Sequence, residues 1–294
     1  MMQMEFLDSL SIAVLAENSV LQGTKFLGQH GISFYVVASK NGLLKHILID
    51  TAQNAQAVLH NMKLMGIQAS SIDAIILTHC HYDHTDGLAD MLKNIDKRDL
   101  PVIAHPDLFR ETFVEKPFFR SIGMNSQHSK AALEELGAHW FLTAEPLQVL
   151  PGLTTTGYIA RSNDFEDPGI VSKTIDHDSR VIPDPMRDDI SVIAATKDKG
   201  LIILTGCSHA GIVNIVNHAI AMTGLQKVQM LIGGLHLVDA SQERIEKTVD
   251  MLDSLICGSV YAGHCTGFDA EIALRSRFKD RFLPLQTGMR FEIA

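Results

Sequence analysis

The stretch THCHYDH, residues 78–84, decides more about the fold and chemistry of this chain than any other. It directly follows residues 72–77, a nearly continuous apolar run that predicts a buried strand. Four of its seven residues are potential metal ligands: His79, His81, Asp83 and His84. Neutral imidazole and carboxylate groups suit zinc, and also iron or manganese. The stretch therefore predicts a metal centre at the end of a buried strand, where sites on layered α/β proteins tend to form.

The spacing of these ligands favours two neighbouring metal positions. His79 and His81 are two residues apart in an extended loop, so both rings can point to one side. Asp83 and His84 begin the next turn and can point to a second place nearby. Two such ions would lie roughly 3.5–4 Å apart and activate water between them. Cys80 alternates with the two histidines and is predicted to point away from the metals, as a small buried residue.

The rest of the chain predicts two halves, each with strands first and helices after them. In the first half, strands at 31–38 and 46–50 flank an Asn-Gly turn typical of hairpins. Helices at 54–65 and 88–95 and a strand at 101–104 follow. The second half is expected to contain strands at 190–195, 201–204, 228–232 and 260–262, and helices at 212–222 and 240–255. This order favours two sheets packed face to face with helices outside. Residues 109–188 are expected to form loops or a lid.

Composition excludes several classes of protein. The 294 residues are 46% hydrophobic and carry a formal net charge of −9, which argues against a nucleic-acid partner. Four cysteines in a chain of this size are too few for a disulfide scaffold. No apolar run is long enough to span a membrane, and Glu5 and Asp8 make the N-terminal stretch unlike a signal peptide. We expect one cytoplasmic domain over residues 1–294.

The ligand stretch resembles the His-x-His-x-Asp-His signature of the metallo-β-lactamase superfamily. Asp50, at the end of a predicted strand, resembles the superfamily's early structural aspartate, which orients the ligand loop. His264, in AGHCTG at 262–267, resembles its late histidine ligand. The resemblance covers nearly the whole chain. It implies an α/β fold, the four-layer αββα sandwich, with the metals at one end of the two sheets.

A narrower resemblance rests on four further motifs: HGIS at 30–33, TGCSHAG at 205–211, GGLHL at 233–237 and GHCTG at 263–267. Together they are similar to the branch that contains archaeal 7,8-dihydropterin-6-methyl-4-(β-D-ribofuranosyl)aminobenzene 5′-phosphate synthases. Those enzymes join a dihydropterin diphosphate to an aminobenzene riboside phosphate. The resemblance implies either that transfer reaction or a hydrolysis, because both use the same stabilisation of negative charge.

The superfamily pattern assigns the ligands to two ions. One ion is expected on His79, His81 and His209, and the other on Asp83, His84 and His264. The chain departs from the pattern in two places. The usual His-Thr-Pro-Gly-His-like loop is missing, so His209 stands in for its histidine. Cys207 occupies the place of the bridging aspartate.

Further residues are expected to contact substrate or move protons. Asp83 is predicted to shuttle a proton as well as to bind metal. His236 is assigned a catalytic role, either as a donor behind the ligands or as a substrate contact, although a buried structural histidine is the open alternative. Ser208 and Thr266, in Gly-rich loops beside predicted ligands, are expected to donate to phosphate oxygens. The N-terminus of the helix at 212 would add favourable partial charge.

These features lead to one hypothesis and one rival. The chain is predicted to be a metal-dependent hydrolase or transferase that acts on a phosphorylated or otherwise anionic small molecule. Its cofactors would be two zinc ions, with manganese or iron as alternatives. The rival is a non-catalytic metal- or ligand-binding sensor with a degraded site. The missing histidine loop and Cys207 favour the rival, and the intact ligand stretch opposes it.

Overall fold

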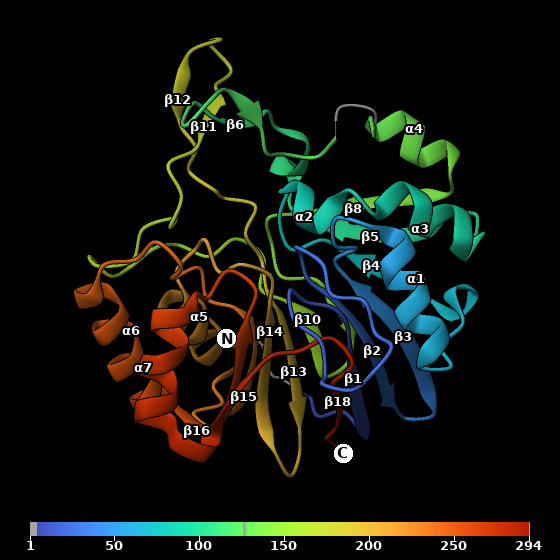
Figure 1. The fold of residues 1–294 in the computed structure, drawn as a ribbon. Coiled ribbons are helices and arrows are strands. Elements are labelled where there is room, and N and C mark those ends of the chain that lie inside the picture. The colour runs from blue at the N-terminus through green and yellow to red at the C-terminus, as the bar shows by residue number, and fades with distance from the viewer. Residues whose placement is uncertain (1–4, 126–127, 294) are drawn as a thin grey trace.

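Two seven-stranded sheets packed face to face form the centre of the protein (Figure 1). The structure, a computed structural model, describes residues 5–125 and 128–293. Its first sheet combines an antiparallel part, β18 to β3, with a parallel part, β3 to β8. In spatial order its strands are β18 (Arg290–Glu292), β1 (Ser9–Ala16), β2 (Ser33–Lys40), β3 (Leu43–Ile49), β4 (Ala74–Ile76), β5 (Leu100–Ala104) and β8 (Ala138–Leu142).

The second sheet is built from the other half of the chain. Strands β14 to β17 run parallel to one another, so their carboxyl ends lie at one edge of the sheet. In spatial order its strands are β17 (Phe282–Pro284), β16 (Ile256–Gly263), β15 (Val228–Gly234), β14 (Gly200–Thr205), β13 (Val192–Thr196), β10 (Leu153–Thr155) and β9 (Gln148–Leu150).

Helices cover the outer faces of both sheets (Figure 1). The first half supplies α1 (Ala55–Leu64), α2 (Tyr82–Thr85), α3 (Leu88–Ile95) and α4 (Lys130–Glu135), and the second half α5 (Ile212–Thr223), α6 (Gln242–Leu255) and α7 (Phe268–Phe278). Local sequence explains where they begin. The side chain of Asn54 accepts a hydrogen bond from the backbone N–H of Gln56 and caps α1. These layers confirm the predicted αββα sandwich.

Successive side chains of a strand pack into different apolar layers on the two faces of its sheet. Leu10, Ile12 and Val14 of β1 face the space between the sheets, where they join residues of both. Ala13 and Leu15 of the same strand pack on the opposite face with the helices of the first half. Burying one such side chain contributes roughly 1.5–3 kcal/mol. A third layer lies between the second sheet and α5, α6 and α7.

The middle of the chain corrects one expectation. Residues 109–188, predicted as loops or a lid, contain β8, β9 and β10 of the main sheets. They also form the whole of a separate four-stranded sheet beyond the ends of the main sheets: β12 (Val181–Pro183), β11 (Lys173–Ile175), β6 (Thr112–Val114) and β7 (Arg120–Ser121) (Figure 1). Strands of two or three residues are too short to show a period in the sequence. None of the helices in the described ranges is long and apolar enough to cross a membrane.

Candidate metal centre

The candidate site lies where loops from the two sheets meet. Strand β4 of the first sheet leads into the loop and single helical turn that carry residues 79–84. Strands β14, β15 and β16 of the second sheet lead into the Gly-rich loops that carry Cys207, His209, His236 and His264. Because parallel strands end at the same edge of a sheet, loops distant in sequence converge there.

The six predicted ligands come together around a seventh residue, Cys207. Ligand atoms of one group all lie within 4.8 Å of one another: Asp83, His84, Cys207 and His264. A second group with the same property contains His79, Cys207 and His209. The ring of His81 lies beside that second group, with its centroid 4.7 Å from those of both His79 and His209. The two groups match the predicted division into two positions, with the Cys207 thiol between them.

The first position has nitrogen atoms that need a partner. The buried Nε2 atoms of His79, His81 and His209 have no hydrogen-bond partner within the described ranges. The Nδ1 atom of His209 lies 2.7 Å from the carbonyl oxygen of Pro168, which fixes the ring so that Nε2 faces the centre. A buried polar atom without a partner costs about 1–3 kcal/mol. Three such nitrogens facing one another fit a divalent ion.

The second position is held by contacts among its own ligands. Nε2 of His84 lies 3.2 Å from Sγ of Cys207, and Nε2 of His264 lies 3.2 Å from Oδ2 of Asp83. On the outer side, Nδ1 of His264 lies 3.0 Å from Oδ1 of Asn18. Two imidazoles, a carboxylate and a thiol also form a donor set that zinc accepts.

Asp50 locks the ligand loop to the first sheet. Its buried carboxylate accepts hydrogen bonds from the backbone N–H and the hydroxyl of Thr78, both at 2.7 Å. The same carboxylate lies 2.7 Å from Nδ1 of His84. Asp50 itself has φ +56°, an unusual conformation that three hydrogen bonds hold in place. This is the orienting role that the family resemblance implies for it.

The protonation states inferred for the first position suit metal binding. Burial lowers the pKa of His79 and of His209 well below the usual value, and it lowers the pKa of His81 to about 4. The three rings are therefore neutral at pH 7, the form in which histidine binds metals.

The second position carries charge. Burial would raise the pKa of Asp83, but His84 and His264 lower it well below the usual range, so the carboxylate is ionised. Burial would likewise lower the pKa of His264, but Cys265 and Asp83 raise it to about 9. A cation bound here would replace the proton on His264 as the partner of the Asp83 carboxylate.

Comparison with known proteins identifies the family of the chain. Residues 45–165 match the family model described as the beta-lactamase superfamily domain. The chain is 40% identical over 283 residues to 7,8-dihydropterin-6-methyl-4-(beta-D-ribofuranosyl)-aminobenzene-5'-phosphate synthase of Methanocaldococcus jannaschii, with 96% of each chain covered. The chain belongs to the metallo-β-lactamase superfamily.

Solved structures of the superfamily share its fold. Tm1679, described as a metal-dependent hydrolase of the beta-lactamase superfamily, superposes with a TM-score of 0.79 at 22% identity, covering 97% of this chain and 99% of that one. Zinc-bound PqqB from Methylobacterium extorquens gives a TM-score of 0.56 at 13% identity, covering 96% of this chain and 100% of that one.

The structure adds two residues to the centre that the sequence analysis did not assign to it. Cys265 forms a third potential ligand group with Cys207 and His236, again within 4.8 Å. Nε2 of His30 lies 3.4 Å from Oδ2 of Asp83. The available signals were their motifs, GHCTG for Cys265 and HGIS for His30. Cys80, by contrast, is fully buried in the apolar layer beside the helices of the first half, on the side that its alternation predicts.

His236 sits at the edge of the centre. Its ring centroid lies 4.1 Å from that of His209, and its Nδ1 has no hydrogen-bond partner among the residues that the structure describes. Its backbone is in the left-handed region, with φ +47°, which is uncommon for a residue other than glycine. The position is compatible with a donor behind the ligands and with a substrate contact, and the unpartnered Nδ1 disfavours the third alternative, a satisfied structural histidine.

Ser208 and Thr266 differ from expectation. The fully buried hydroxyl of Ser208 donates to the carbonyl oxygen of Gly234 at 2.6 Å. The fully buried hydroxyl of Thr266 donates to the carbonyl oxygen of Gly263 at 2.6 Å and accepts from the backbone N–H of Leu235. Because both hydroxyls have partners inside the protein, we assign them to holding the ligand loops together, not to binding phosphate.

Buried carboxylates hold the N-terminus of α5, where the sequence predicted favourable charge for an anion, and two of the loops near the centre. Glu166 accepts hydrogen bonds from the backbone N–H groups of Val213 and Asn214 at 2.9 and 3.0 Å, so the N-terminus of α5 is already capped by a negative charge. Asp188 accepts from the backbone N–H of Cys80 at 2.8 Å, and Asp189 accepts from that of Ala210 at 2.7 Å. These acids brace the loops, and the expected anion site at α5 is not available.

Proposed function

We propose that this protein is a metal-dependent enzyme that acts on a phosphorylated small molecule, by the transfer reaction of the dihydropterin–aminobenzene riboside phosphate synthases. One observation carries the proposal. The six predicted ligands converge around Cys207, in a chain that is 40% identical over 96% of its length to a protein named as that synthase. A degraded sensor would be expected to have lost some of those ligands.

We assign two divalent ions to the centre, with zinc as the first candidate and manganese or iron as alternatives. One would be held by His79, His81 and His209, and the other by Asp83, His84 and His264, with the Cys207 thiol between them. When bound, such ions stabilise negative charge on a leaving diphosphate and lower the pKa of water.

The side chains around the ions are assigned proton transfer and substrate positioning. Oδ2 of Asp83 lies 3.4 Å from Nε2 of His30, whose side chain is 49% exposed, so the pair connects the centre to solvent. We propose that Asp83 accepts the proton released in the reaction and passes it to His30. His236, next to His209, would position the substrate or its leaving group.

In the transfer reaction, the bond between the dihydropterin methylene carbon and its diphosphate breaks. The amino nitrogen of the aminobenzene riboside phosphate forms the new bond to that carbon, and a proton on the nitrogen leaves to Asp83. Hydrolysis would replace the amino nitrogen with water at the same place. The two outcomes need the same stabilisation of the leaving group, so only the presence of the acceptor distinguishes them.

The test measures diphosphate release by protein loaded with zinc, manganese or iron. We expect release from dihydropterin diphosphate only when aminobenzene riboside phosphate is present, together with formation of the joined product. Equal release without the acceptor would identify a hydrolase instead. Asp83→Asn should abolish the reaction. His177→Ala is the matched control, because that side chain is 88% exposed.

A second test addresses the substrate class. Phosphodiesters, phosphomonoesters, lactones and thioesters are assayed side by side, with inorganic phosphate and diphosphate as inhibitors. A clear preference for lactones or thioesters, without inhibition by either anion, would contradict the phosphate assignment. Metal analysis of the purified protein tests the sensor alternative, which predicts almost no bound metal and no gain on reconstitution.

A further inference from the structure

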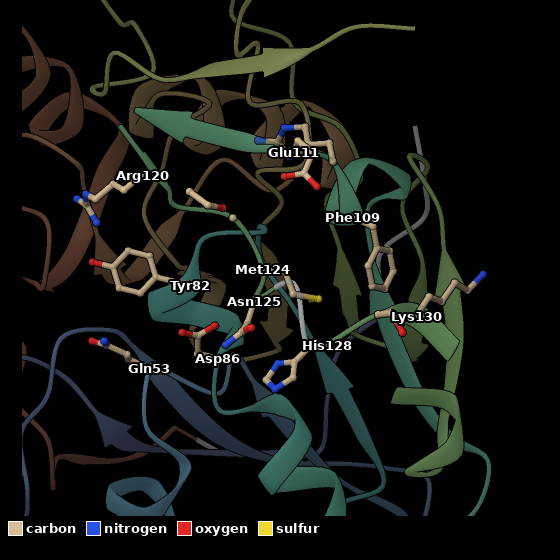
Figure 2. A pocket seen from close by; sticks show the side chains of 14 residues that line it. Gln53, Tyr82, Asp86, Phe109, Glu111, Arg120, Met124, Asn125, His128 and Lys130 are labelled. Carbon is tan, nitrogen blue, oxygen red and sulfur yellow. The ribbon is translucent and has the colours of Figure 1, made fainter. Parts of the chain in front are cut away.

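A cavity of about 860 Å³ opens beside α2, next to the metal centre (Figure 2). Its walls come from α2, from the chain between Phe109 and Glu111, from β7 and from the segment that leads into α4. The volume lies in the range of pockets that bind small molecules, about 300–1,000 Å³. The lining residues that matter here are Tyr82, Asp86, Phe109, Arg110, Arg120 and Lys130.

We propose that this cavity binds the phosphorylated aromatic substrate, with its phosphate on Arg120 and its aromatic ring against Tyr82. The inference rests on the proposed function, because it names the place where the substrate of that reaction is held. The hydroxyls of Ser208 and Thr266 and the N-terminus of α5 already have partners inside the protein, which leaves the phosphate to the ions or to a cation of the cavity.

The short helix α2 connects the cavity to the metals. Asp83 and His84 of this helix belong to the ligand cluster, whereas Tyr82 and Asp86 line the cavity. The ring of His30 lies between Tyr82 of the cavity and His264 of the ligand cluster. Its centroid is 6.0 Å from that of Tyr82 and 5.2 Å from that of His264. A ring packed on Tyr82 would therefore be separated from the ligands by a single side chain.

Arg120 is a cation that no protein carboxylate neutralises. Its guanidinium carbon lies 5.9 Å from the centroid of the Tyr82 ring, and within residues 5–125 and 128–293 no acidic side chain forms an ion pair with it. Arg110, which also lines the cavity, differs because it is paired with Asp184 and Asp188 at 3.0 and 2.7 Å. The planar fork of an unpaired arginine matches phosphate oxygens. Arg120 is therefore the candidate phosphate contact of the cavity, whose lining also contains the acidic residues Asp86 and Glu111.

The cavity also offers aromatic surfaces for a ring. Figure 2 shows Arg120 above Tyr82 at one end, and Phe109 near Lys130 at the other. The ring of Phe109 packs edge-on against Trp140, with centroids 4.9 Å apart. Trp140 is the only tryptophan of the chain, so its fluorescence reports on this wall of the cavity. Aromatic contacts of this kind contribute about 0.5–1.5 kcal/mol beyond their buried area.

Binding of a simple probe tests the charge contact. Metal-loaded protein is titrated with phenyl phosphate and, separately, with phenol, by Trp140 fluorescence and calorimetry. We expect phenyl phosphate to bind more tightly than phenol. Arg120→Ala should raise its Kd about tenfold or more, equivalent to about 1.4 kcal/mol, and Arg120→Lys should restore part of the loss. Arg180→Ala is the control, because Arg180 is 67% exposed and does not line the cavity.

A second pair of variants tests the ring contact. Tyr82→Leu should weaken the binding of phenyl phosphate, whereas Tyr82→Phe, which keeps the ring face, should bind nearly as well as the wild type. Metal content is measured for both, because Tyr82 neighbours two ligands. Loss of binding in Tyr82→Leu with metal retained supports the ring contact, and equal binding by all three proteins refutes it.

Two results would overturn the proposal. One is an unchanged Kd in Arg120→Ala. The other is a phosphate preference that chelation of the metals abolishes and that Arg120→Ala leaves intact, which would place the phosphate on the ions. Because these titrations need no turnover, they are independent of the proposed reaction. If the diphosphate-release assay fails while binding still depends on Arg120, the reaction is wrong and the cavity assignment stands.

Discussion

The two ring nitrogens of His79 have different surroundings, which indicate that the residue is a metal ligand. Its Nδ1 lies 3.1 Å from the hydroxyl of Thr78, while its buried Nε2 has no hydrogen-bond partner in the described part of the chain. A histidine held on one side and unsatisfied on the other fits a ligand better than a packing residue. The same reasoning applies to His209, which Pro168 holds from behind.

We predict that His79→Ala removes most of the metal from one of the two positions and abolishes activity, by at least about 100-fold, while the protein stays folded. The physical reason is the loss of one of three nitrogen ligands from the position that has no carboxylate. Metal quantification, circular dichroism and turnover are measured together. Near-wild-type activity of the variant on a verified substrate would show that the assignment is wrong.

A paired experiment separates a ligand from its neighbour. His209→Ala should lower metal content, because its Nε2 faces His79 and His81. His236→Ala should lower turnover with metal retained, because its ring lies behind His209. Metal analysis and kcat of both variants decide the matter. The opposite pattern, metal loss only in His236→Ala, would mean that the two roles are exchanged.

At the scale of elements, hydrogen bonds between distant segments set where each helix sits. Asn61 in α1 is fully buried. Its amide donates to the carbonyl oxygens of Leu15 and Leu27 at 2.8 Å, and its oxygen accepts from the backbone N–H of Leu27 at 2.9 Å. The side chain thereby joins α1 to β1 and to the loop after it.

Asn61→Ala should therefore lower the free energy of unfolding by about 2–4 kcal/mol, since three buried backbone groups lose their partner. A loss of that size should lower the melting temperature by roughly 5–10 °C. Asn94→Ala is the matched control, an asparagine on the exposed face of α3, and should change stability by less than about 0.5 kcal/mol. Equal melting temperatures for Asn61→Ala and the wild type would contradict this account.

At the scale of the whole molecule, the metal centre joins the two halves of the sandwich. Asp83 and His84 follow β4 of the first sheet, whereas Cys207 and His264 follow β14 and β16 of the second. An ion held by all four would tie the sheets together at one edge. The layer of apolar side chains between the sheets does the same over their full width.

Removing the metal should therefore destabilise the entire protein. With free metal at 100 to 1,000 times its Kd, binding stabilises the folded state by roughly 3–4 kcal/mol. Calorimetry of chelated and reconstituted protein measures the difference in melting temperature. A single transition in both forms is expected if residues 1–294 are one domain. Identical melting temperatures would argue against ions that bridge the sheets, and two separate transitions would argue against a single domain.

The sequence by itself was sufficient to predict the sandwich and the six candidate ligands that the fold brings together. Those features are local. Four ligands lie within residues 79–84, each strand and helix of more than four residues leaves its own period, and His209 and His264 stand in Gly-rich motifs directly after predicted strands. Four elements that exceed that length are exceptions, because we did not predict them: β1, α4, β8 and α7.

Only the tertiary structure decided which partners the polar side chains of the site loops contact. Cys207 lies between the two ligand groups. The hydroxyls of Ser208 and Thr266 donate to neighbouring backbone carbonyls. Glu166 caps the N-terminus of α5 and accepts from Val213, 47 residues away along the chain. The cavity beside α2 likewise combines segments that have no common motif. The physical reason is that a hydroxyl, a carboxylate or a helix end binds whatever the fold brings within about 3 Å, and such neighbours leave no trace in local sequence.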